Sequence, residues 1–324
     1  MTRARLASLH IASAAVAVSL FSAVISGVKA DNWPFPSRSP AGANSSLSPA
    51  PAPRATRPPF DFPLRQETWN QLPDHQLSPV GEAAHALRPE RWLHGETENF
   101  IFHFRSLGDA LQVAREIEFD LWYVAQSLGA SRDTYTRKSH IFVFADEREW
   151  QTFLAGTHAP GWTHSFAHED ELFLNIGGTG HGFDSQTLAH ETTHAVVARI
   201  YGRRRWPVWL NEGFAEYMGE ASVAARHWQS PLSNQRSLQA AQMTVAELFA
   251  TKQYPAEIAV VGRLYDTSAK FVRYLFNKYP KQLFPKFVDR LLDGEAAPAA
   301  LIAIYGNEFR DMDAFEKRFS QFVR

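Results

Sequence analysis

The sequence predicts an α+β fold, in which a small N-terminal mixed sheet with helices is followed by a mainly helical C-terminal lobe. Three observations lead to this prediction. Short apolar segments rich in Phe, Ile and Val, typical of strands, lie before residue 183. After that point apolar residues recur at helical spacing to the end of the chain. No repeat at solenoid periods is present.

Strands are expected at residues 100–104, 140–144 and 171–175, where the chain reads FIFHF, HIFVF and ELFLN. A helix is expected from Leu107 to Leu128, because apolar residues recur there every three or four positions. A short helix with Trp150 and Phe153 follows the second strand. The later helices are expected near residues 185–201, 207–220, 245–250, 262–279, 281–293, 296–304 and 311–322.

The N-terminal segment, residues 1–30, is expected to be a signal peptide. Arg3 and Arg5 precede an apolar stretch, and Val28-Lys29-Ala30 resembles a cleavage site. We therefore expect an exported protein, secreted or periplasmic. An uncleaved membrane anchor is the alternative, because about eighteen apolar residues approach the length of a membrane span. The chain has no cysteine, which excludes a lipid-modified cysteine as anchor and excludes disulfides.

Residues 31–90 are expected to form a tether and an irregular extension. The first part is rich in Pro, Ser and Ala and cannot bury a core, so we expect it to be disordered or polyproline-like. The domain prediction is completed by an α/β lobe with an edge strand at 91–183 and a helical lobe at 184–324 that carries the metal site.

The charge of the chain argues against a nucleic-acid partner. Its formal net charge is −1, and its one basic run is Arg203-Arg204-Arg205. We expect this run to end the loop after the helix at 185–201 rather than to bind phosphate.

The segment HETTH, residues 190–194, carries the strongest functional signal. His190 and His194 are four residues apart, so on a helix they lie on one face and can reach one metal ion together. Glu191 can sit beside a water on that metal and take its proton. The bland alternative is two histidines on a half-buried helix beside a solvated glutamate.

The surrounding sequence supports a buried metal helix. Asp184 or Ser185 can cap its start, Arg199 suits its last turn, and Gly202 is a natural stop. The downstream segment WLNEGFAEY supplies a third ligand, Glu212, at the start of another helix. Three protein ligands with one open position are typical of a catalytic zinc, so we predict one Zn²⁺ ion.

HETTH together with WLNEGFAEY resembles the gluzincin zinc metallopeptidases, in particular the peptidase MA-like domains related to the M1 type. The resemblance implies a zincin-like fold in which His190, His194 and Glu212 bind zinc and Glu191 is the general base. The interval from His194 to Glu212 is one residue shorter than in the M1 pattern. The GxMEN segment of M1 aminopeptidases is missing, so aminopeptidase activity is not implied.

Two further residues are candidates for the site. Glu216 follows Glu212 by four positions and could bond the free ring nitrogen of a ligand histidine; it could instead be a surface charge, or the metal ligand in place of Glu212. Tyr265, in LYDTSAK, is expected to open a helix and resembles the YEKGA tyrosine of M1-type enzymes, which stabilises the oxyanion. A buried tyrosine that anchors a helix remains an equal alternative.

The expected reaction is hydrolysis of a peptide or protein substrate by a metal-activated water. The predicted strand at 171–175 is the expected edge strand, which would pair with the substrate backbone. Thr163, His164, Ser165 and His168 flank it and could line the cleft; the favoured alternative is that each is an ordinary loop or strand-face residue. Two alternatives stay open: a non-catalytic, peptidase-like binding module of the cell envelope, and a hydrolase of a non-protein amide or an ester.

Overall fold

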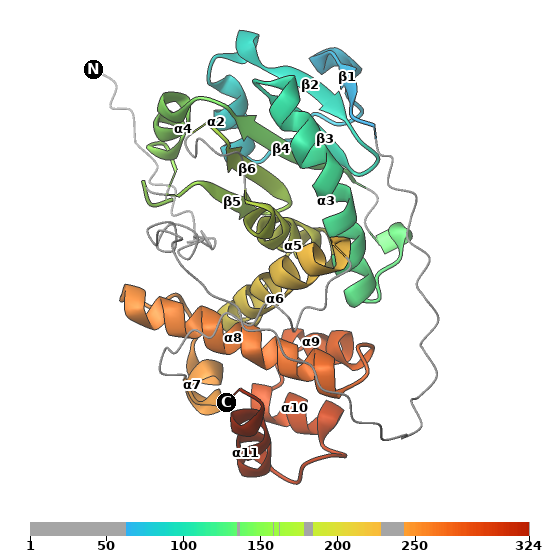
Figure 1. The fold of residues 1–324 in the computed structure, drawn as a ribbon, viewed down its shortest axis with the longest axis vertical. Coiled ribbons are helices and arrows are strands. Elements are labelled where there is room, and N and C mark those ends of the chain that lie inside the picture. The colour runs from blue at the N-terminus through green and yellow to red at the C-terminus, as the bar shows by residue number, and fades with distance from the viewer. Residues whose placement is uncertain are drawn as a thin grey trace, which may run out of the picture.

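The computed structural model describes residues 63–134, 137–157, 159–161, 163–177, 184–227 and 243–323 (Figure 1). The predicted α+β fold is confirmed: a six-stranded mixed sheet comes first and helices follow. The expected signal peptide at 1–30 and the Pro-rich stretch that follows it, up to residue 62, lie outside the described residues. Among the described residues, no helix combines the length and apolar character that a membrane span needs.

The sheet has the strand order β1-β2-β3-β4-β6-β5. The parallel pairs are β3 with β4 and β4 with β6, and the other neighbours are antiparallel. A parallel pair needs a crossover connection, and α3 (Leu107–Ser127) supplies it between β3 and β4. The strands are β1 (Arg65–Glu67), β2 (Leu93–Glu96), β3 (Phe100–Phe104), β4 (Ser139–Phe144), β5 (Ser165–His168) and β6 (Glu171–Asn175).

The predicted edge strand was wrong. Residues 171–175 do form a strand, β6, but it lies between β4 and β5, so β5 is the edge. Glu169, with a φ of 55°, reverses the chain between the two strands. The short mixed sequence SFAH does not show the apolar alternation that predicts a strand, so only its pairing with β6 reveals it.

The predicted boundary at residue 90, between the irregular extension and the α/β lobe, also lies too far along the chain. Within the expected extension at 31–90, β1 pairs with β2 and helix α2 (Pro79–Ala86) contacts β4. Ser78 caps α2, and the buried carboxyl group of Glu171 accepts hydrogen bonds from both the backbone N–H and the hydroxyl of Ser78. These contacts attach the segment to the sheet.

Alternating residues of the central strands face two separate cores. On β4, Ile141 and Val143 pack in the core that contains α3 and the later helices, whereas Phe142 and Phe144 pack with α2 and α4 (Glu147–Leu154). The two-residue period of a strand therefore explains why the run HIFVF is apolar throughout: both faces of the sheet are covered.

The seven helices predicted after residue 183 are all present. Helix α5 has the predicted bounds; Asp184 caps it and Gly202, with a φ of 59°, ends it. The helices are α5 (Ser185–Tyr201), α6 (Val208–Arg226), α7 (Val245–Ala250), α8 (Ile258–Lys278), α9 (Leu283–Leu292), α10 (Ala297–Tyr305) and α11 (Met312–Phe322).

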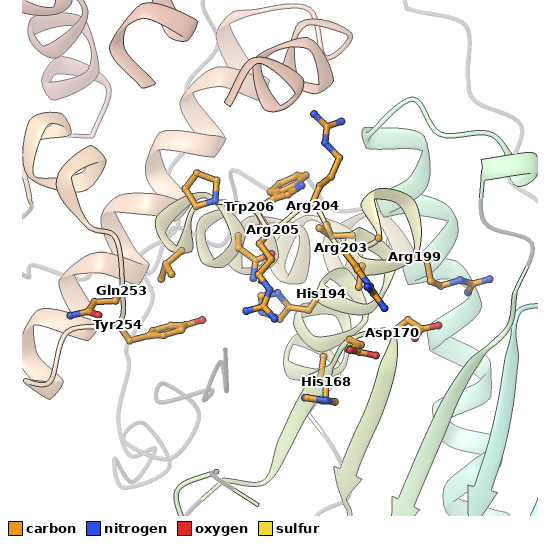
Figure 2. Close-up of a pocket in the computed structure, with 18 of the residues that line it drawn as sticks. His168, Asp170, His194, Arg199, Arg203, Arg204, Arg205, Trp206, Gln253 and Tyr254 are labelled. Atoms are coloured by element: carbon orange, nitrogen blue, oxygen red, sulfur yellow. Dashed lines mark hydrogen bonds between the residues drawn. The ribbon is translucent and has the colours of Figure 1, made fainter. Parts of the chain in front are cut away.

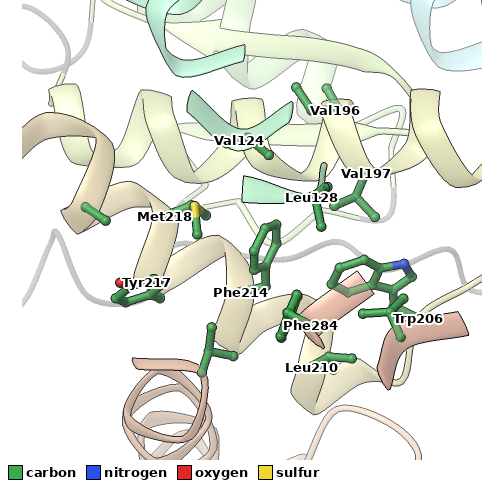
Figure 3. Packing of buried hydrophobic residues seen from close by; sticks show 14 of the residues in the cluster. Val124, Leu128, Val196, Val197, Trp206, Leu210, Phe214, Tyr217, Met218 and Phe284 are labelled. Atoms are coloured by element: carbon green, nitrogen blue, oxygen red, sulfur yellow. The ribbon is translucent and has the colours of Figure 1, made fainter. Parts of the chain in front are cut away.

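Helices α5 and α6 form the centre of the molecule, between the sheet and the C-terminal helices (Figure 1). Their shared core contains Val196 and Val197 from α5 and Phe214 from α6, packed with Leu128 beyond α3 and Phe284 of α9 (Figure 3). Buried polar contacts add to this packing. Asp120 of α3 accepts hydrogen bonds from Ser222 and Arg226 of α6, and Arg273 of α8 pairs with Glu220 of α6.

Gly213 allows α6 and α8 to approach each other closely. A Cβ atom at this position would lie 2.6 Å from backbone atoms of Ser268. We expect Gly213→Ala to lower the free energy of unfolding by about 1–3 kcal/mol, because rigid backbone must move to accept the methyl group. Gly108→Ala is the control, since its nearest neighbour would be 3.8 Å away. Urea unfolding measures the stability of both variants. An equal change in the two would contradict the close approach of α6 and α8 at Gly213.

Three histidines form a buried chain on the α2 side of the sheet. His103 of β3 lies 2.9 Å, ring nitrogen to ring nitrogen, from His94 of β2 and from His140 of β4. Neutral imidazoles suit this chain, because each offers one donor and one acceptor. Burial lowers the pKa of His94 and of His140 to about 4, and that of His103 well below its usual range.

These histidines should make stability depend on pH. Between about pH 6.5 and pH 4 the unfolded chain binds protons that the folded chain excludes, so the free energy of unfolding falls as the pH falls. Glu171, whose pKa burial raises to about 7, acts in the opposite direction, so a difference between variants is informative. We expect wild type to lose about 1–2 kcal/mol more than His94→Gln between pH 7 and pH 4.5 in urea unfolding. Equal losses of unfolding free energy in the two proteins would contradict the conclusion that these buried histidines are uncharged.

Candidate metal centre and active site

Three side chains from α5 and α6 converge on one point. The Nε2 atoms of His190 and His194 lie 3.1 Å apart, and Oε2 of Glu212 lies 3.6 Å from each of them. All three side chains are buried. Among the described residues, this is the one group of three or more His, Cys, Asp or Glu residues with ligand atoms close enough to share a metal ion.

The geometry fits a small divalent cation. Ligands about 2.0–2.1 Å from a tetrahedral zinc are roughly 3.3 Å apart, close to the separations within this cluster. Within the described part of the chain, Oε2 of Glu212 is buried with no hydrogen-bond partner. A buried carboxylate oxygen without a donor is costly, and a cation between it and the two imidazoles would remove that cost.

The local sequence explains how the ligands are placed. The four-residue spacing stacks His190 and His194 on one face of α5. Helix α6 begins just after Pro207, and Glu212 lies in its second turn, three residues after the buried Trp209. Gly219 lets α6 run close against α5, because a Cβ there would meet the backbone oxygen of Gln186 at 3.0 Å.

The cluster is strongly coupled electrostatically. Burial alone would raise the pKa of Glu212, but the neighbouring His194 and His190 hold it well below its usual range. Burial likewise opposes the charging of His190, yet the nearby carboxylates of Glu212 and Glu216 raise its pKa well above the usual value. A metal ion needs an imidazole nitrogen that carries no proton, so metal binding would displace a proton held by His190.

Polar groups hold the far side of each imidazole. Oε2 of Glu216 lies 3.2 Å from Nδ1 of His190, and the side-chain amide of Asn211 lies 3.0 Å from Nδ1 of His194. Contacts of this kind fix the orientation of a ligand histidine. Because Glu216 meets the ring nitrogen that points away from the cluster, the arrangement favours Glu212 over Glu216 as the third ligand.

The predicted base lies beside the cluster. Glu191 is fully buried on α5, and the hydroxyl of Ser165 on the edge strand β5 donates a 3.5 Å hydrogen bond to its carboxylate. Edge strand and carboxylate are therefore neighbours.

Tyr265 is near the cluster, but it does not open a helix as predicted: α8 begins at Ile258, because the apolar spacing extends further back than we had placed it. Its ring stacks parallel to that of His190, with 6.3 Å between centroids. Burial, followed by the charge of Glu212, raises its pKa well above the usual value, so the phenol keeps its proton.

Tyr254 is a site residue that the sequence did not reveal. It lies between α7 and α8, and its hydroxyl donates a hydrogen bond to Oε1 of Glu212. Burial raises its pKa well above the usual value too. It follows Glu212 by forty-two residues, and no motif or helical spacing links the two positions. The contact of Asn211 with His194 was not predicted either; its position directly before Glu212 was the signal that could have revealed it.

A cavity of about 1290 Å³ opens onto the cluster at His194 (Figure 2). It lies between the end of β5, the loop after α5, and residues 252–254. Of the four residues expected to flank the cleft, His168 lines it and Ser165 contacts Glu191. Thr163 is buried, with its carbonyl accepting a hydrogen bond from Trp150, and the carbonyl of His164 accepts one from Asn175.

Comparison with protein families gives one result for this architecture. The family model described as Peptidase MA superfamily matches residues 127–324, a range that contains α5, α6 and every residue of the cluster. No curated protein matches the chain. Since the family match covers more than half of the 324 residues, the chain belongs to the Peptidase MA superfamily.

Proposed function

We propose that the protein is a zinc-dependent metallopeptidase. The observation that carries this proposal is the convergence of two imidazoles and one buried carboxylate oxygen, which within the described residues accepts no hydrogen bond, at zinc-ligand spacing and next to a buried glutamate. His190, His194 and Glu212 would hold the ion. When bound, zinc supplies a Lewis acid and acidifies a water at its open position.

Glu191 is the general base in this proposal. It follows the first ligand directly on α5, and Ser165 of the edge strand donates a hydrogen bond to its carboxylate, so it would be a neighbour of a water held at the cluster. It accepts a proton from that water and returns it to the departing amine, which completes the hydrolysis. An intact base beside an intact ligand set argues against a non-catalytic binding module, which would have no use for Glu191.

Two phenols flank the cluster and could stabilise negative charge on the substrate oxygen. Both Tyr254 and Tyr265 are buried and keep their protons, as an oxyanion donor must. Tyr265 is the donor we assign, in agreement with the sequence resemblance; its ring lies parallel to that of His190, with 6.3 Å between the centroids.

The edge strand β5 offers a place for the substrate backbone. It pairs with β6 on one side and borders the cavity at Ala167 and His168 on the other. An extended peptide added to this edge would run past the cluster. The N-terminal sequence further supports a protein that acts after export, on peptide or protein substrates outside the cytoplasm.

The proposed base can be tested with Glu191→Gln. We expect this variant to bind one zinc ion per chain but to hydrolyse a mixed peptide library at least about a thousandfold more slowly, because glutamine cannot accept the proton. The measurements are zinc content of the purified protein and product formation by mass spectrometry. Glu308→Gln, an exposed change far from the cluster, is the control. Activity that survives in Glu191→Gln would refute the mechanism.

The proposed ligands can be tested by zinc titration against a chromophoric chelator. We expect Glu212→Gln and His194→Ala to lose high-affinity zinc binding, because each removes one of three protein ligands. Glu216→Gln should bind zinc about 10–100-fold more weakly, since it only orients His190. Affinity should also fall at acid pH, because a protonated His190, whose pKa its acidic neighbours raise against the effect of burial, cannot bind the ion. A folded wild-type protein that takes up no zinc would overturn the proposal.

A further inference from the structure

The cavity beside the cluster is rich in cations. Two acids, Glu169 and Asp170, line it together with six basic residues: Arg137, Arg199, Arg203, Arg204, Arg205 and Lys252. This concentration contrasts with the formal net charge of −1 for the whole chain. Clefts lined by one sign of charge attract ligands of the opposite sign.

Some of these cations are already neutralised. Arg137 pairs with Asp74 at 2.8 Å and lies 3.8 Å from Asp170. Arg204 pairs with Asp293 at 2.7 Å and lies 3.8 Å from Asp289 at the end of α9. These arginines therefore have structural partners within the chain.

Arg203, Arg205 and Lys252 differ in this respect. None of the three has an acidic partner within the part of the chain that the structure describes. The residues outside that part include only two acids in sequence, Asp31 and Asp61, so the chain has few further groups that could pair with them. Figure 2 shows Arg205 extending from the loop toward His194 and Arg203 extending toward Asp170, whereas Arg204 extends in the opposite direction.

We propose that the enzyme selects peptides with acidic side chains, Asp or Glu, close to the bond that is cut, and that Arg203 and Arg205 bind them with help from Lys252. This inference rests on the proposed peptidase function and adds its substrate class. The side chains reach a cavity that also contains His194 and Tyr254, so a peptide lying across the cluster passes them. Arg205 is also close enough to His168 on the edge strand for its charge, after burial, to lower the pKa of that histidine.

An acidic peptide suits this surface better than an extended polyanion. The unpaired cations lie on one loop and one short segment inside a cavity, and the neighbouring Glu169 and Asp170 would repel a long negative strand. A guanidinium can bind a carboxylate with two parallel hydrogen bonds, so two neighbouring arginines without acidic partners within the described residues would be selective for Asp and Glu side chains.

The test measures binding without hydrolysis. The zinc-loaded Glu191→Gln variant of the whole chain is titrated by calorimetry with ten-residue peptides of alanine, serine and glycine. Each peptide carries two adjacent test residues, Glu-Glu, Gln-Gln or Lys-Lys, placed at successive positions. The same titrations are repeated after adding Arg203→Gln with Arg205→Gln, Arg203→Lys with Arg205→Lys, or the matched control Arg204→Gln, whose arginine is already paired.

For at least one placement we expect the Glu-Glu peptide to bind at least tenfold more tightly than its Gln-Gln counterpart at low salt, and the preference to shrink in high salt. The preference should fall below twofold in the double glutamine variant, return in part with lysines, and persist in Arg204→Gln. Equal binding of the Glu-Glu and Gln-Gln peptides at every placement would overturn the inference, as would a preference that survives the double glutamine change. Because this readout needs no turnover, a wild type that cleaves no peptide would contradict the proposed peptidase activity through a separate experiment.

Discussion

The site depends on one interaction: a buried carboxylate, that of Glu212, faces two buried imidazoles without a donor for one of its oxygens. Burying such a group is costly unless something compensates it. A divalent cation would do so, and the neighbouring imidazoles of His194 and His190, which hold the pKa of Glu212 well below its usual range, do so in part. The close approach of the helices at Gly213 and Gly219 serves this contact, because it brings α5, α6 and α8 within reach of one another.

The position of α5 links the two halves of the molecule. It packs against α3 and the edge of the sheet on one side and against α6 on the other. Glu191 is thereby placed under β5, while His190 and His194 face α6. One helix thus brings the proposed base to the strand that could hold the substrate and the proposed ligands to the third carboxylate. The cluster itself comes from α5 and α6, and the sheet adds the edge strand β5 beside it.

Charge distinguishes the two environments around the cluster. Within the cluster, the negative charges of Glu212 and Glu216 lie against the imidazole of His190 and favour its charged form, although burial opposes it. Outside, the cavity wall carries arginines, some paired within the chain and some directed to the cleft. The carboxylates of the cluster suit a metal cation, whereas the arginines of the cavity wall suit an acidic side chain of a substrate.

Features that depend on local spacing could be predicted from the amino-acid sequence. The four-residue interval of His190 and His194, the cap at Asp184 and the apolar period of the later helices all arise within one helix, so they could be predicted to within a few residues. The sequence did not predict that β5 is an edge strand or that β1 belongs to the sheet, because strand order depends on pairing between distant segments. Contacts between distant residues came from the folded chain alone: Glu212 rather than Glu216 meets the two imidazoles at Nε2, and Tyr254 donates a hydrogen bond to Glu212 across forty-two residues. The same holds for Arg204, which pairs with Asp293 although it belongs to the same basic run as Arg203 and Arg205. Contacts between separate elements are set by packing, and no periodicity in the sequence encodes them.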